Sequence, residues 1–230
     1  MSEREPLSIV ICSHGDRRGQ DRDRHLYRLQ EDIQKLVPDV EIVTARLSQE
    51  DELETAIHAT IGEIVCILPI FFSDGYFYNK IKQVVEGSDR DCVIVPPLAE
   101  WPELCELIDK KVTDEAPVVL IAHGSQKSSA SRDSTERVRN TLSRCFKRKV
   151  DACYLEEPPF AEEFMSARTE AVCVVGLFFG QGLHGKTDFQ DAVSAPIHPV
   201  LDAFVVGELQ ELAELCANKA IEATQINLGN

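Results

Sequence analysis

An internal repeat constrains this chain more than any other feature of its sequence. Residues 9–15 (IVICSHG) have a counterpart 109 positions later in residues 118–124 (VVLIAHG), and both copies end on a His-Gly pair. A second apolar landmark, residues 64–72 (IVCILPIFF), recurs 107 positions later as residues 171–179 (AVCVVGLFF). Two landmarks repeated in order at nearly equal distances indicate a duplicated unit of about 110 residues, a common domain size. We therefore expect two similar units, residues 1–114 and 115–230.

Apolar runs alternate with amphipathic, helix-like segments through both halves of the chain. The runs are continuous rather than alternating, which is typical of strands buried on both faces of a parallel sheet. The expected strands are residues 7–12, 40–47, 63–70, 92–95, 118–122, 150–155, 171–177 and 197–200. Helices are expected between them, one starting at Thr187, and a closing helix over residues 205–223. This order predicts an α/β protein with two mostly parallel four-stranded sheets, each flanked by helices.

Composition narrows the possible partners and the compartment. The sequence has no apolar run of 18 residues, and its start, MSEREP, does not resemble a signal peptide, so we expect a soluble cytoplasmic protein that binds no membrane. A net charge of −15 argues against a nucleic-acid partner. The eight cysteines form no CxxC pair, which favours free thiols in a reducing compartment over disulfides or a metal finger.

Two histidines of the second half follow buried strands of the predicted sheet. His123 follows the first strand of its unit and His184 the third, and the loops after parallel strands meet at the carboxyl edge of a sheet. A single histidine is more often a packed or surface residue, but two imidazoles at one edge suit Co, Ni, Fe or Zn and leave coordination positions open. Glu156 or Glu157, after the second strand, is expected at the same edge; the alternative is a solvated loop tip.

The first half keeps only part of this pattern. His14 is present, but Phe77 stands where His184 would fall, and Arg46 stands near the place of Glu156. We therefore expect the working site in the second unit. The aromatic residues of the first unit either provide an apolar wall for a flat ligand or fill a core; they are Phe71, Phe72, Tyr76, Phe77 and Tyr78. No GxGxxG, P-loop or nucleophile elbow is present, which disfavours nucleotide-binding and serine-hydrolase functions.

Three motifs of the second half carry a family resemblance: AHGS at residues 122–125, YLEEPPF at 154–160 and VVGLFFGQGLHGKTD at 174–188. In these the chain resembles the class II tetrapyrrole chelatases of the sirohydrochlorin cobaltochelatase and ferrochelatase family. The first half matches more weakly, through SHGDRRG and PIFFSDG. The resemblance implies two flavodoxin-like units facing each other across a cleft. It also implies that His123 and His184 are metal-binding and catalytic, with Glu156 or Glu157 as the acidic catalytic residue.

The same resemblance implies the reaction and its partners. A chelatase of this family inserts a divalent metal, Co²⁺ or Fe²⁺, with Ni²⁺ also suited to imidazole ligands, into sirohydrochlorin or a related reduced tetrapyrrole for cobalamin or siroheme biosynthesis. It needs no organic cofactor and is expected as a monomer or homodimer. Substrate carboxylates need cations, for which Lys127, Arg132 and Lys186 flank the motifs, and the expected substrate-binding residues are Ser125, Lys127, Gly182 and Lys186. Two alternatives stay open: a metal or tetrapyrrole carrier without turnover, and a structural α/β protein.

Overall fold

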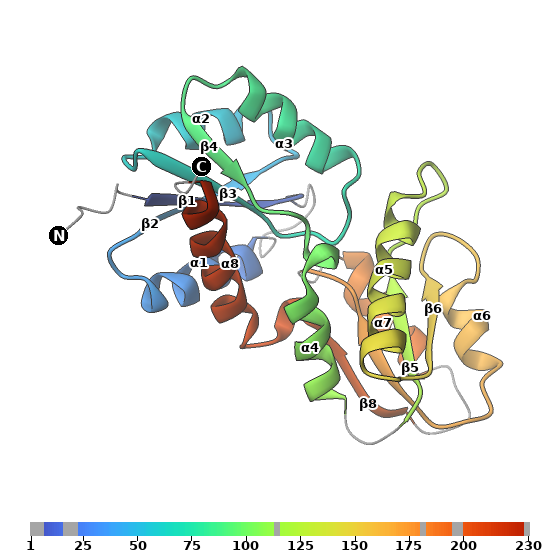
Figure 1. Ribbon diagram of the computed structural model, residues 1–230. Coiled ribbons are helices and arrows are strands. Elements are labelled where there is room, and N and C mark those ends of the chain that lie inside the picture. Colours follow the sequence, from blue (N-terminus) through green and yellow to red (C-terminus); the bar gives the residue numbers. More distant parts are fainter. Residues whose placement is uncertain (1–6, 16–22, 113–115, 180–182, 195–199, 228–230) are drawn as a thin grey trace. The chain divides into compact units, whose positions relative to one another are not determined.

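The chain forms two separate four-stranded parallel sheets (Figure 1). A computed structural model describes residues 7–15, 23–112, 116–179, 183–194 and 200–227. The first sheet has the order β2-β1-β3-β4 and the second the order β6-β5-β7-β8, and neighbouring strands run parallel in both. The strands are β1 (Leu7–Ser13), β2 (Glu41–Arg46), β3 (Ile64–Pro69), β4 (Asp91–Ile94), β5 (Val118–Ala122), β6 (Val150–Tyr154), β7 (Val172–Gly176) and β8 (Val200–Val205). The identical orders confirm the predicted duplication and the α/β class.

Helices connect these strands, as the alternating pattern predicts. They are α1 (Arg24–Leu36), α2 (Glu52–Ala59), α3 (Tyr76–Gly87), α4 (Pro102–Lys111), α5 (Ala130–Cys145), α6 (Ala161–Ser166), α7 (Leu183–Ser194) and α8 (Leu212–Asn227), with 3-10 turns η1 (Leu98–Glu100) and η2 (Val206–Glu208). In α1, buried Leu26, Leu29 and Ile33 recur at helical spacing and form the stripe that faces the core. The helix ends at Leu36, just before Pro38, which cannot continue it.

The compact units differ from a simple cut of the chain at residue 114. Contacts group residues 1–71, 76–97 and 210–230 as unit 1, and residues 72–75 and 98–209 as unit 2. The last helix of each repeat is therefore exchanged: α8 packs on α1, β3 and β4, while α4 packs on α5 and η1. Burial explains the exchange, because each helix buries an apolar stripe against the unit on which it packs. The stripes are Leu104, Cys105 and Ile108 in α4, and Leu212, Cys216, Ala217 and Ala220 in α8.

The end of the second repeat differs from its prediction. Strand β8 covers Val200–Val205 rather than residues 197–200, of which 197–199 lie outside the described residues. The predicted helix at 205 is instead the short turn η2, and α8 begins at Leu212. Alternate residues of β8 are exposed, as in a strand at the border of a sheet, so its sequence lacks the continuous apolar run of the inner strands. Helix α7 likewise begins at Leu183, before the predicted Thr187.

The eight cysteines all lie among the described residues and none forms a disulfide, as predicted. Burial raises the pKa of Cys66 and of Cys153 to about 12, so both stay protonated and unreactive at neutral pH. Cys145 is the exposed one. Within the described parts of the chain, no helix is long and apolar enough to cross a membrane.

Arg90 provides a test of the packing in unit 1. Its guanidinium donates to the carbonyl oxygen of Ile57 (3.2 Å), in the last turn of α2, and to those of Thr60 (2.9 Å) and Gly62, just beyond its end. Charge-assisted bonds to carbonyls at a helix end are worth more than neutral ones. We expect Arg90→Met to lower the free energy of unfolding by about 2–3 kcal/mol, measured by urea denaturation. The control Arg28→Met removes an exposed ion pair to Asp32 and should change it by less than about 0.5 kcal/mol. Equal effects in the two variants would contradict this role for Arg90.

Candidate metal-binding site

His123 lies on a tight turn at the carboxyl end of β5. The next residue, Gly124, has a φ of +76°, a conformation that favours glycine, and a Cβ there would lie 2.8 Å from Tyr154 Cβ and 2.8 Å from Glu157 Cγ. The chain leaving β6 runs beside this turn, because Leu155 N donates to Ala122 O (3.0 Å) and Glu156 N donates to His123 O (2.9 Å). The His-Gly pair found in the sequence is thus the turn that brings two loops together.

Glu156 is the glutamate that faces His123. Its Oε2 lies 3.6 Å from His123 Nδ1, and the two side chains are 60% and 56% exposed. An imidazole and a carboxylate this close, both open to solvent, can reach the same incoming cation.

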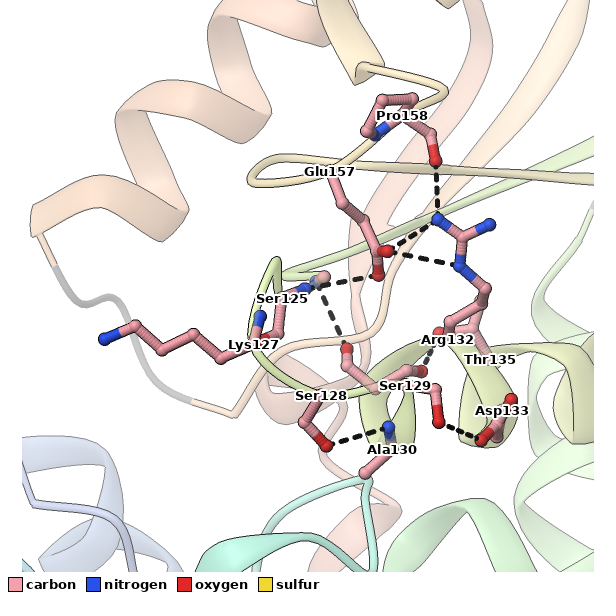
Figure 2. A network of polar contacts seen from close by, with 12 residues as sticks. Ser125, Lys127, Ser128, Ser129, Ala130, Arg132, Asp133, Thr135, Glu157 and Pro158 are labelled. Carbon is pink, nitrogen blue, oxygen red and sulfur yellow. Dashed lines mark hydrogen bonds and ion pairs between the residues drawn. The ribbon is translucent and has the colours of Figure 1, made fainter.

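Glu157, the neighbouring residue, points into a different environment (Figure 2). Its side chain is 8% exposed, and its Oε2 accepts from Arg132 Nη2 at 2.5 Å and Nε at 3.1 Å. Its Oε1 accepts from the backbone N–H of Ser125 at 3.2 Å. Of the two glutamates left open by the sequence, Glu156 therefore lies beside the histidine, while Glu157 is paired with Arg132. Nothing in the motif YLEEPPF alone indicated this pairing.

The remaining predicted site residues are only partly described. Ser125 and Lys127 lie in the loop after His123, where Ser125 Oγ accepts from Lys127 N at 3.2 Å and the Lys127 side chain is exposed (Figure 2). His184 is the second residue of α7 and Lys186 the fourth, but their side chains lie outside the described residues, as does Gly182. Among the side chains that the structure describes, no three His, Cys, Asp or Glu gather as a ligand set for a metal ion.

Unit 1 repeats the backbone of this site. Leu47 N donates to Ser13 O and Ser48 N donates to His14 O, both at 2.9 Å, and Gly15 has a φ of +74°. Ser48 thus occupies the place of Glu156. The prediction that Arg46 stands near that place is corrected by the register, because Arg46 pairs with Ser13 as Tyr154 pairs with Ala122.

The two units can also be compared at the helix that follows the third strand of each sheet, α3 after β3 and α7 after β7. Phe77 is the second residue of α3, as His184 is the second residue of α7, so the predicted correspondence of these two residues agrees with the element boundaries. In unit 1 the rings of His14 and Phe77 are in contact, with centroids 4.3 Å apart and planes at 89°. The fold therefore brings these two loop positions together. The equivalent positions of unit 2 hold His123 and His184.

The aromatic residues of unit 1 are shared between core and surface. Phe71 and Phe77 are half-buried against the apolar cluster around Val10, Val65 and Ile67. Tyr76 is 76% exposed. Core packing thus accounts for part of this set, and the apolar wall for a flat ligand stays a prediction.

Comparison with known proteins agrees with this architecture. The profile of the CbiX family matches residues 8–115 and again residues 117–223. A search among curated proteins finds no match. Among solved structures, the chain is similar to CbiX, described as the terminal enzyme for biosynthesis of siroheme in denitrifying bacteria, with a TM-score of 0.72, 19% identity, and 94% of this chain and 99% of that chain covered.

Two further structures have the same fold. SirB from Bacillus subtilis with Fe³⁺ gives a TM-score of 0.70 at 17% identity, with 98% of each chain covered. The sirohydrochlorin chelatase SirB from Bacillus subtilis subspecies spizizenii in complex with cobalt gives 0.69 at 17% identity, again with 98% of each chain covered. At these identities the structures establish the fold, while the profile covers both halves of the sequence. The chain therefore belongs to the CbiX family.

Proposed function

We propose that this protein inserts a divalent metal, Co²⁺ or Fe²⁺, into sirohydrochlorin or a related reduced tetrapyrrole, at a site in unit 2. The ring contact between His14 and Phe77 carries the proposal, because the equivalent positions of unit 2 are both histidines. The nearby Glu156 supplies the third group. Solved structures of this fold that hold cobalt or Fe³⁺ support the choice of metals.

Each residue has a distinct role in this proposal. Neutral His123 and His184 hold the incoming ion and leave coordination positions open for the pyrrole nitrogens. Two pyrrole N–H protons leave the ring as the ion enters; the solvent-exposed Glu156 carboxylate offsets charge on the ion and accepts one of them, and the other passes to solvent. Ser125, Lys127, Gly182 and Lys186 are proposed to contact the substrate. Arg132 is left out of this set, because it is committed to Glu157 and Pro158.

The reaction occurs without an organic cofactor in this proposal, and the metal is a substrate. Imidazole ligands accept both cobalt and iron, so the donor set does not select between a cobalamin and a siroheme route. A cytoplasmic location and a monomeric or homodimeric state are part of the same proposal.

The direct test is metallation of the tetrapyrrole. Purified protein is incubated anaerobically with sirohydrochlorin and either Co²⁺ or Fe²⁺, and the absorbance change of the macrocycle is followed. We expect a protein-dependent rate well above that of the buffer. Tight binding of metal or tetrapyrrole without any rate increase would show a carrier instead, and no binding of either would leave a structural α/β protein.

Comparison of His14→Ala with His123→Ala tests the assignment to unit 2. We expect His123→Ala to lower the metallation rate far more, because His14 has Phe77 and Ser48 where a second histidine and a glutamate would be needed. The rates are measured under the conditions of the direct test. Equal losses in the two variants would move the site out of unit 2.

A further inference from the structure

An ion pair between Arg132 and the buried carboxylate of Glu157 joins three segments of the chain (Figure 2). Glu157 belongs to the loop after β6, Arg132 to the first turn of α5, and Ser125 to the loop between β5 and α5. The Glu157 carboxylate connects its own loop to the other two segments, because it accepts from Arg132 Nη2 at 2.5 Å, Arg132 Nε at 3.1 Å and Ser125 N at 3.2 Å. Arg132 Nη2 also donates to Pro158 O at 2.9 Å, so the guanidinium holds the glutamate's side chain and its loop at once.

The turn that carries His123 is tied to the same group of contacts. Gly124 N donates to Ser131 Oγ at 3.1 Å, one residue before Arg132 on α5. The Arg132 guanidinium lies over the Tyr154 ring, 5.4 Å from its centroid. His123 is followed in the chain by Gly124, which bonds to Ser131, and Glu156 is followed by Glu157, which bonds to Arg132 and Ser125.

The internal repeat offers an independent comparison. In unit 1, Ser48 replaces Glu156, and the residue that follows it is the exposed Gln49 in place of Glu157. Gln49 N donates to Arg46 O, and Arg46 pairs with Glu52 and Asp23 instead. Unit 1 thus joins the start of α1 to the end of β2 through Arg46 and Asp23, whereas among the described residues the pair of Arg132 with a buried glutamate belongs to the unit that keeps a glutamate beside its histidine.

We infer that Arg132 and Glu157 are positioning residues that fix the separation of His123 and Glu156; the catalytic meaning of this inference rests on the proposed function. A carboxylate that is 8% exposed and bonded through both oxygens is poorly placed to exchange protons with substrate. Its contribution is to hold two otherwise exposed side chains in register. Partners that orient metal ligands typically change metal affinity by about 10–100-fold when they are removed.

The experiment compares Glu157→Gln, Arg132→Met and the double variant with wild type. We expect each single variant to weaken Co²⁺ binding roughly tenfold, measured by titration calorimetry, and to lower kcat while leaving KM for sirohydrochlorin nearly unchanged. The double variant should be no worse than the worse single variant, because the pair acts as a unit. Arg132→Lys should restore only part of the affinity, since an ammonium cannot make the two-nitrogen contact.

Arg139→Met is the matched control. It breaks a 2.6 Å ion pair with Glu136 on the same helix, without touching Glu157 or Ser125, and should leave Co²⁺ affinity and kcat unchanged. The amide of Ser125 gives a readout without turnover, because its hydrogen exchange should accelerate in Glu157→Ala, where the acceptor is gone.

Two results would overturn the inference. One is a lower melting temperature in the Arg132 and Glu157 variants with Co²⁺ affinity and kcat per folded molecule unchanged, which would make the pair purely structural. The other is an unchanged exchange rate for the Ser125 amide in Glu157→Ala. An inactive wild type would refute the proposed function alone, because amide exchange and Co²⁺ affinity still decide whether the pair holds the loops.

Discussion

His123→Ala and His184→Ala should each lower the metallation rate at least about 100-fold, more than the loss of an outer partner of a metal ligand. The double variant should lose little beyond either single variant. Two ligands of one ion act together, so removal of either already prevents productive placement of the metal, and the effects cannot add. This is the largest effect on activity that the proposed site predicts.

Rates and thermal unfolding of the three variants check this expectation. His123 is 56% exposed at the end of β5, so its replacement should change the free energy of unfolding by no more than about 0.5 kcal/mol. Losses that multiply in the double variant would show that the two histidines act on separate events. A large fall in melting temperature with full activity per folded molecule would assign them to structure.

Gly124→Ala should destabilise the protein by about 2–4 kcal/mol. The φ of +76° costs an L-residue about 1–2 kcal/mol, and the added methyl group would lie 2.8 Å from Tyr154 Cβ and from Glu157 Cγ, which forces a shift of packed atoms. Because that shift would displace the loop of Glu156, metallation should also fall. Urea denaturation gives the stability and the absorbance assay gives the rate.

Gly87→Ala is the control for this prediction. Gly87 ends α3 with no neighbouring atom within 4 Å of an added Cβ, so alanine there should change stability by no more than about 0.5 kcal/mol. A Gly124→Ala protein as stable as Gly87→Ala would mean that the turn at His123 can relax, and that the close contacts around it do not constrain the site.

Much of the architecture could be predicted from the sequence, because the information is local and repeated. The continuous apolar runs indicated buried parallel strands, and the repeat identified the equivalent His-Gly pairs at 14–15 and 123–124, both of which have positive φ at the glycine. The correspondence of Phe77 with His184 followed from the repeat distance alone, and the second positions of α3 and α7 agree with it.

The features that could not be predicted depend on contacts distant in sequence or on register. Adjacent residues of an extended chain point to opposite sides, so the pair Glu156-Glu157 could not be assigned without knowing which one faces His123. The two repeat distances, 109 and 107 positions, did not fix the equivalent of Glu156, and the structure places Ser48 there, two residues after the predicted Arg46. The exchange of α4 and α8 leaves no local signal, because an amphipathic helix shows which face it buries but not the surface that covers it.

Anomalous diffraction at the cobalt edge, from crystals of the full chain grown with Co²⁺, tests the placement of the metal most directly. The proposed site predicts one strong peak bonded to imidazole nitrogens of His123 and His184 at about 2.0–2.1 Å, the usual length of such bonds for a similar divalent ion, with Glu156 facing it. A peak at His14, or a peak at neither histidine of unit 2, would contradict the account.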